Sequence, residues 1–451
     1  MACVDGRKVS HVRRIRGRTG VPQRSAARVA KGDGNIHLTD GDNDLQIVVT
    51  VNGPGEVSSW LHPLALALKQ RLPSARICVA LVPCVFSSGS ELAVVKSLPY
   101  VDASFSIDET MGLIWRNRTP AGLRRKAPGL VLHLGGDVIF SVLLSRRLGV
   151  PCLAYAERPV SLPWFFDKVF YSGFEKLPAN KDARDIVGEM MVDAARMRCP
   201  QRSPARSGKM TVGLYPGSRD YLVKFMLPFY AAAAELVREA GHDVEWLVAK
   251  SDFLAADFLR AIPSVDDDRP LDGVDLAWAE EGGRQFLVTP SGLRIAVATH
   301  GEVASRANLV LTLPGTNTAE LSALGVPMVV TVPTYQSERV PMPGIAGHIG
   351  RLPIIGKYIK RGVARLIVRK LKFMSHPNRR LDRMLVPEMI GHLTARQVAD
   401  RVIEMLSADT RALEDELRAT MGAPGASQRL ASALVDYLNT AVAVHEVAPA
   451  R

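Results

Sequence analysis

A repeated unit of apolar strand, glycine-containing turn and helix constrains this chain of 451 residues most strongly. In the first half, "LQIVVTVN" predicts a buried strand, "GPGEVSSW" a turn and "LHPLALALKQRL" a helix. In the second half, "MTVGLYPGSRD" and "LVKFMLPFYAAAAELVREAG" repeat the same order. Strands that alternate with helices predict parallel sheets with helices on both faces. The repeat therefore predicts two successive Rossmann-like α/β domains.

The length of the chain also favours two domains, because a single hydrophobic core rarely serves more than ~300 residues. We expect a first Rossmann-like domain over residues 45–205 and a second over 206–426. The polar segment "CPQRSPARSGK" predicts the linker between them. Within 427–451, "SQRLASALVDYLNTAVAV" predicts a C-terminal helix. Residues 1–44 are Arg-rich and predict a disordered extension, while a transit peptide or a start codon placed too early stays open.

The composition narrows the class of protein. An apolar fraction of 47% with 23% charged residues is typical of a globular chain. The 5 cysteines are odd in number and form no CxxC motif, which favours a reducing compartment. The net charge of +12 is concentrated in residues 1–32 and 331–380. Neither segment shows aromatic interleaving or a nucleic-acid motif, so we expect no nucleic-acid partner.

A basic amphipathic stretch, "LPIIGKYIKRGVARLIVRKLKF", lies within a predicted insertion at residues 340–373. Its basic stripe consists of Lys357, Arg361, Arg365 and Arg369, opposite an apolar Ile/Leu/Val face. This pattern predicts contact with an anionic membrane surface, although an ordinary surface helix packed on its own domain is the alternative. No apolar run is long enough to span a membrane. We therefore expect a cytoplasmic protein, peripheral on the cytoplasmic membrane face.

The turns after the predicted strands carry the candidate chemistry, since α/β sheets bind ligands at the carboxyl ends of their strands. "LYPGSRD" places Gly217, Ser218 and Arg219 at such an end. Helix N-termini and arginine both favour phosphate, which predicts a phosphate-binding turn. The alternative is a surface arginine paired with Asp220.

"LPGTNTAE" forms a second candidate turn. Gly315 permits close backbone approach, Thr316 and Thr318 offer hydroxyls, and Glu320 lies one turn into the following helix. A carboxylate at that position can accept both ribose hydroxyls of a nucleotide whose diphosphate lies at the helix start. The alternative is that Asn317 and Thr318 only cap the helix, with Glu320 completing its first turn.

Two carboxylates are candidate catalytic groups. In "HLGGDVIFS", Asp137 follows a buried strand and two glycines, where it can serve as a general base or as a helix N-cap. Glu56 in "GPGEVSS" has the same two interpretations. His133 lies within the strand and is expected to be a core residue. No metal-binding constellation is evident, so we expect neither a metal nor another cofactor.

Five segments carry a family resemblance. "GGD", with Asp137, falls where that family has "GID", and "VGEMMVDA" resembles its "IGHxxxDA". "LYPGSR" matches "LLPGSR", "GTNTAELSALGVPMVV" matches "GTxxxE…PMVV" without a gap, and "PNRRLDRMLVPE" follows "PNxxxxRxxVxE". In this order and spacing, residues 45–440 resemble the lipid-A-disaccharide synthase family, glycosyltransferases of the GT-B fold.

The resemblance implies an inverting transfer of an acylated glucosamine from a UDP-sugar to a lipid-linked sugar acceptor. In that family's scheme Glu320 holds the ribose, and Asn378 and Arg383 line the donor pocket. Asp137 accepts the proton of the attacking hydroxyl. Arg219 and a helix N-terminus stabilise the leaving diphosphate in place of a metal. The oligomeric state is not predicted.

Several departures concern the acceptor side. The family's "GExSGD" is "GEVSSW" here, its "PDFN" after the catalytic Asp is "VIFS", and the His of its "GH" turn is Glu189. The segment between "PMVV" and "PN" is also much longer than in the family. Two alternatives therefore stay open: a UDP-sugar epimerase of the same fold, and a non-catalytic relative that binds nucleotide or lipid.

Overall fold

The computed structural model describes residues 45–83, 87–174, 185–205, 207–255, 257–262, 272–334 and 372–447. The predicted extension and the basic stripe of Lys357, Arg361, Arg365 and Arg369 lie outside these residues. The disorder of the first and the membrane contact of the second stay predictions.

The first half of the chain forms a six-stranded sheet in the order β3-β2-β1-β4-β5-β6, with all strands parallel. Its strands are β1 (Gln46–Val51), β2 (Arg76–Leu81), β3 (Ala103–Phe105), β4 (Gly129–His133), β5 (Cys152–Ala156) and β6 (Lys168–Tyr171). Its helical elements are α1 (Pro54–Glu56), η1 (Val57–Leu61), α2 (His62–Arg71), α3 (Glu91–Ser97), α4 (Ile107–Arg116), α5 (Val138–Leu148), η2 (Pro163–Phe165) and α6 (Met190–Arg198).

The second half forms an eight-stranded sheet in the order β14-β13-β12-β7-β8-β11-β10-β9. Its strands are β7 (Met210–Tyr215), β8 (Val244–Ala249), β9 (Ala277–Glu281), β10 (Arg284–Val288), β11 (Arg294–Ala298), β12 (Leu309–Thr312), β13 (Met328–Pro333) and β14 (Glu388–Gly391). Its helical elements are α7 (Asp220–Glu239), η4 (Phe258–Ala261), α8 (His300–Arg306), α9 (Thr316–Leu324), α12 (His376–Leu381), α13 (Ala395–Ser407), α14 (Arg411–Met421) and α15 (Ala426–Val447).

The two sheets share one topology. In the first, β1 lies centrally between β2 and β4; in the second, β7 lies between β8 and β12. The strand order reverses beside β1 and beside β7, and such reversals are where α/β sheets bind ligands. The second sheet adds only the antiparallel hairpin β9–β10 at its edge, which the sequence pattern did not predict.

Both sheets are covered by helices on both faces. In the first half, α2 and α15 pack on one face, and α4 and α5 pack on the other. In the second half, α7 and α13 cover one face, and α8, α9 and α14 cover the other. This burial explains why β1 reads "QIVVTV" with every residue buried, since a parallel sheet leaves no face to water.

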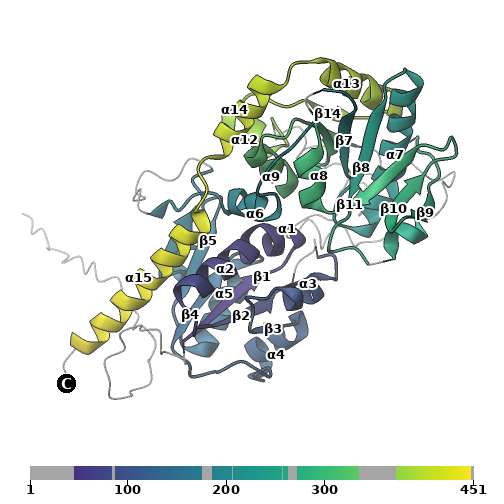
Figure 1. Cartoon of the computed structure of the whole chain (residues 1–451). Coiled ribbons are helices and arrows are strands. Elements are labelled where there is room, and N and C mark those ends of the chain that lie inside the picture. Colours follow the sequence, from purple (N-terminus) through teal and green to yellow (C-terminus); the bar gives the residue numbers. More distant parts are fainter. Residues whose placement is uncertain are drawn as a thin grey trace, which may run out of the picture.

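The C-terminal helix returns to the first half of the chain (Figure 1). Leu430, Ala431, Leu434 and Leu438 of α15 are buried in the core that β1 and α2 form. The two Rossmann-like parallel sheets and this returning helix confirm the predicted fold class, which is the GT-B arrangement. Figure 1 also shows α6 between the two halves, and its residues share a buried cluster with α9.

Candidate active site

The turns that follow β1 and β12 meet at the boundary between the halves of the chain. Gly55 lies after β1, and Thr316 begins α9 after β12. A Cβ added at Gly55 would lie 2.8 Å from the Thr316 Cγ2 atom. Only glycine therefore allows this approach without a shift of the threonine. The structure thus brings together one predicted turn from each sheet.

Glu56 is enclosed between the turns that follow β1 and β4. Its Oε2 accepts hydrogen bonds from the backbone N–H groups of Gly53 at 2.9 Å and Asn52 at 3.1 Å. A side chain at Gly135 would overlap its carboxyl group. Burial raises the pKa of Glu56 to about 7, and the nearby Arg219 opposes this rise. Glu56 and Arg219, from opposite halves, are therefore electrostatically coupled.

Asp137 occupies the N-cap position of α5, and its Oδ1 accepts a hydrogen bond from the Ile139 N–H at 3.1 Å. The capping alternative is confirmed. The residue is exposed, so a substrate hydroxyl can reach it, and its role as a base stays a prediction. His133, by contrast, is 7% exposed and hydrogen-bonds Ser141 through Nδ1 at 2.8 Å. This confirms its assignment to the core, where burial lowers the pKa of the imidazole to about 4.

The donor-side turns begin two helices. Gly217 has φ of +112° and Ser218 is half-buried, while Arg219 is the N-cap of the 20-residue helix α7. Gly315, with φ of +145°, is the N-cap of α9, and no side chain caps that helix. The capping alternative for "TNTAE" is therefore wrong. An uncapped N-terminus keeps its N–H groups for another acceptor.

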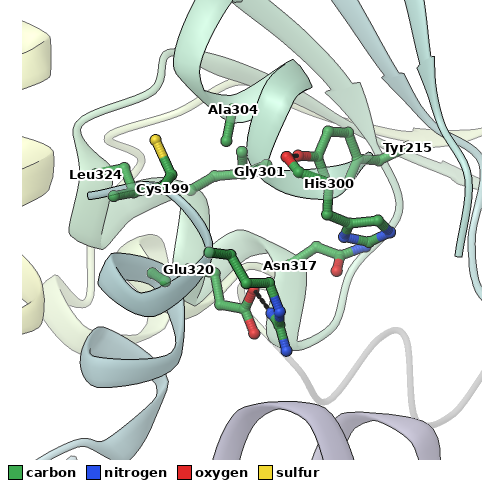
Figure 2. A pocket seen from close by; sticks show the side chains of 11 residues that line it. Cys199, Tyr215, His300, Gly301, Ala304, Asn317, Glu320 and Leu324 are labelled. Carbon is green, nitrogen blue, oxygen red and sulfur yellow. Dashed lines mark hydrogen bonds and ion pairs between the residues drawn. The ribbon is translucent and has the colours of Figure 1, made fainter. Parts of the chain in front are cut away.

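Glu320 is bound by side chains from the first half of the chain. Its Oε1 accepts a hydrogen bond from the Ser59 hydroxyl at 2.5 Å, and its Oε2 forms an ion pair with Arg198, the last residue of α6. The Arg198 guanidinium also donates to the Ser58 carbonyl oxygen at 2.5 Å. Figure 2 marks the ion pair beside Glu320. A ribose can therefore bind Glu320 only after these contacts open.

Ser59 lies where the family's "GExSGD" turn has glycine, within the π-helical turn η1. Such turns recur at functional sites. The departure noted in the sequence thus supplies a contact to Glu320. Sequence reasoning missed both Ser59 and Arg198. No motif marks Arg198, and its only signal is its place at the end of a helix that runs into the predicted linker.

A small cavity adjoins the ion pair, and Figure 2 shows the labelled His300, Asn317 and Tyr215 side chains around it. Its volume of about 10 Å³ suits one water molecule. The Tyr215 hydroxyl donates to the His300 carbonyl oxygen at 2.8 Å. Burial and the nearby Arg198 lower the pKa of the His300 imidazole to about 4. The cavity is too small for a nucleotide in this closed arrangement.

Three other residues predicted to bind the sugar donor make contacts within the protein. Thr318 is fully buried, and its hydroxyl donates to the Gly315 carbonyl oxygen at 2.8 Å. The Asn378 amide accepts from two backbone N–H groups and donates to the Val386 carbonyl oxygen and Glu388. Arg383 is exposed and forms an ion pair with a glutamate on α14. Their roles in donor binding stay predictions.

Among the residues that the structure describes, no cluster of three or more His, Cys, Asp or Glu side chains is placed to hold a metal ion. No helix of the described chain is long and apolar enough to cross a membrane.

Comparisons with known proteins give distant similarities, and no family model matches the chain. The lipid-A-disaccharide synthase of Synechocystis sp. is 24% identical over 266 residues, which is 56% of this chain and 56% of that protein. The chain thus matches little more than half the length of this curated relative.

Among solved structures, an S. aureus MnaA–UDP co-structure is 15% identical, with a TM-score of 0.47 over 88% of this chain and 97% of that chain. The UDP-GlcNAc 2-epimerase from Neisseria meningitidis bound to UDP-GlcNAc is 12% identical, with a TM-score of 0.45 over 87% and 100%. MurG from Acinetobacter baumannii is 14% identical, with a TM-score of 0.44 over 87% and 99%.

Proposed function

We propose that this chain is an inverting glycosyltransferase that moves an acylated glucosamine from a UDP-sugar to a lipid-linked sugar, in glycolipid biosynthesis. One observation carries the proposal. Glu56, a half-buried carboxyl, lies in the turn after β1, where Gly55 closely approaches Thr316 at the start of α9 in the second half, and the charge of Arg219 lowers the pKa of Glu56. A proton-accepting group in a turn that meets a helix N-terminus of the other half suits transfer from a diphosphate to a hydroxyl.

The residues divide the reaction between the two halves. Arg219 and the uncapped N-terminus of α9 at Gly315 attract the diphosphate and stabilise the charge that develops as UDP leaves. Asp137 accepts the proton of the attacking hydroxyl. Glu56 is a second candidate base, because a pKa of about 7 suits proton transfer at neutral pH. The reaction needs no metal in this scheme.

Glu320 binds the ribose hydroxyls in this proposal, which requires exchange of partners. Arg198 and Ser59 hold the carboxylate in the closed arrangement. When the halves separate, Glu320 becomes free to accept two hydroxyls. Glu320→Ala should then weaken UDP binding more than it weakens folding. The opposite result would assign Glu320 to the interdomain contact alone.

The membrane part of the proposal rests on the basic stretch of 340–373, which lies mostly outside the described residues. A lipid-linked acceptor requires access to a bilayer surface, and a basic amphipathic helix provides it. In this proposal the protein is cytoplasmic and peripheral on the membrane.

The decisive experiment incubates the full chain with UDP-diacylglucosamine and a total lipid extract, and mass spectrometry detects a new disaccharide lipid. The proposal expects UDP release that requires the lipid extract and is lost in Asp137→Ala. Glu239→Gln, at an exposed position that ends α7, serves as the control. Turnover of UDP-N-acetylglucosamine without lipid would instead indicate an epimerase. Nucleotide binding without turnover on any lipid would indicate a non-catalytic relative.

A further inference from the structure

Three buried polar atoms without a hydrogen-bond partner gather at a second contact between the halves. They are Oε1 of Glu157, Oε2 of Glu189 and Nη1 of Arg380, and the absence of hydrogen-bond partners holds for the described residues. We call these three residues the interdomain polar cluster. Buried polar atoms are nearly always hydrogen-bonded, so three unsatisfied atoms at one place require an explanation.

The cluster is assembled from distant elements. Glu157 directly follows β5, and Glu189 is the N-cap of α6, while Arg380 belongs to α12 of the second half. His376, also on α12, places its Nε2 3.8 Å from Oε1 of Glu157. The Phe174 ring of the first half lies 5.4 Å from the His376 ring and 5.7 Å from the Arg380 guanidinium carbon. The cluster thus lies between the halves.

The charged groups of the cluster act on one another, and Glu157 also acts on the candidate active site. Burial and the neighbouring Glu157 raise the pKa of Glu189 above its usual range, while Arg380 opposes the rise. Glu157 also raises the pKa of Glu56 and that of Tyr155. The charge of Glu157, directly after β5, thus acts on Glu56, one of the two catalytic candidates.

The unsatisfied buried atoms lower the stability of the folded protein, so a purely structural role does not explain them. Oε1 of Glu189 accepts from the Met191 N–H and the Tyr155 hydroxyl, whereas its Oε2 has no hydrogen bond. A buried carboxyl oxygen without a hydrogen bond destabilises a protein, and apolar side chains of similar volume usually pack there with better stability. Glu189 is 2% exposed, so solvent does not satisfy its free oxygen. Such a cost is typical of a site that binds a ligand.

The chemistry of the cluster selects the ligand. Two carboxyl groups offer acceptors, which disfavours a phosphate. Arg380 offers a charged donor, which disfavours an ammonium group because an ammonium cannot accept a hydrogen bond. A hydroxyl both donates and accepts, so vicinal hydroxyls can satisfy all three atoms. This set of requirements fits a neutral sugar ring.

We propose that the interdomain polar cluster binds the hydroxyl groups of the acceptor sugar, which enters when the two halves separate. This inference rests on the proposed function, because it assigns the acceptor subsite of the same enzyme. It makes Glu157, Glu189 and Arg380 specificity-determining residues. Glu157 and Glu189 would hold the sugar in the first half, and α12 would close over it with Arg380.

The test uses saturation-transfer NMR on the full chain with octyl β-D-glucopyranoside below its micelle concentration, in the presence of UDP. Hexaethylene glycol monooctyl ether, which has the same chain length but no sugar, reports binding of the alkyl chain alone. We expect saturation of the ring protons in the wild type. Glu157→Gln should weaken sugar binding about tenfold, since it replaces a charged acceptor by a neutral one. Glu239→Gln should bind as the wild type.

A stability measurement separates binding from a structural role. Glu157→Met should unfold at the same or a higher denaturant concentration than the wild type while it loses sugar binding. Equal sugar affinity in Glu157→Gln and the wild type, or the absence of ring-specific saturation, would overturn the inference. Reduced stability of Glu157→Met with unchanged sugar affinity would overturn it as well.

UDP binding in the same samples distinguishes the two proposals. If UDP binds but sugar affinity does not depend on Glu157, the acceptor subsite is wrong and the proposed function stands. If sugar binding depends on Glu157 but the wild type does not bind UDP, the subsite stands and the UDP-sugar reaction is wrong. We expect UDP affinity to be equal in the wild type and Glu157→Gln, because Glu157 lies on the other half from the donor turns.

Discussion

Replacement of Glu56 by glutamine tests whether burial raises the pKa of this carboxyl group and thereby lowers the stability of the folded state. Its pKa is about 7 in the folded protein, against an ordinary value of 4.5. Between pH 4.5 and about 7, Glu56 is therefore protonated in the folded state and ionised in the unfolded state. The linkage relation then requires the stability of the wild type to fall as pH rises through this window. The shift corresponds to about 3 kcal/mol, at about 1.4 kcal/mol per pKa unit.

The assay is urea unfolding of the wild type and Glu56→Gln at a series of pH values. The glutamine oxygen can still accept from the N–H groups of Asn52 and Gly53, so the turn is retained. The variant should gain about 3 kcal/mol relative to the wild type between pH ~4 and pH ~8. Glu239→Gln, at an exposed position, should show no such gain. The difference also cancels contributions from other titrating groups, such as Glu189.

A difference in stability that does not change with pH, or that changes in the opposite direction, would refute the burial argument for Glu56. The same variant informs the mechanism. If Glu56 is the general base, kcat/KM of the wild type rises with pH through about 7, and Glu56→Gln abolishes that limb. If Asp137 is the base, Glu56→Gln leaves the pH dependence of kcat/KM unchanged.

Three further predictions concern the other site residues. Asp137→Ala should lose at least ~100-fold in activity, measured by UDP release, but only about 1 kcal/mol of unfolding free energy, measured by urea unfolding, because the cap of α5 is lost. Full activity of this variant would exclude Asp137 as the base. Arg198→Met should lower the free energy of unfolding by about 3–5 kcal/mol, because Glu320 stays buried without its cation. Addition of Glu320→Gln should recover most of this loss, and strictly additive effects in the double-mutant cycle would contradict the buried pair. Asn378→Ala should lower stability by about 2 kcal/mol through lost backbone contacts; unchanged stability with lost UDP binding would restore its donor-pocket role.

The strands and turns of both sheets were predictable from the sequence because their signals are local. Every residue of "QIVVTV" is buried in a parallel sheet, which requires a continuous apolar run. Gly217 and Gly315 adopt positive φ values that side chains disfavour, so glycine marks those turns directly. The repeated order of these signals determined two Rossmann-like sheets.

The contacts between the two halves were decided only by the tertiary structure. Glu320 meets Arg198 across 122 residues of sequence and Ser59 across 261, and no periodic pattern encodes pairs at such separations. The sequence left Glu320 between a ribose ligand and part of a helix cap, and the structure replaced the cap by an interdomain ion pair.

The same limit applies to the carboxyl groups. The sequence placed Glu56 and Asp137 at equivalent turns with the same two interpretations. Packing against Gly135 encloses Glu56 and leaves it half-buried, whereas Asp137 is exposed, and loss of solvent raises the pKa of a carboxyl group. The sequence by itself determined the two sheets and the turns that we propose to bind a nucleotide sugar. Tertiary packing decided which side chains face each other there, because burial and long-range charge depend on residues that are far apart in the chain.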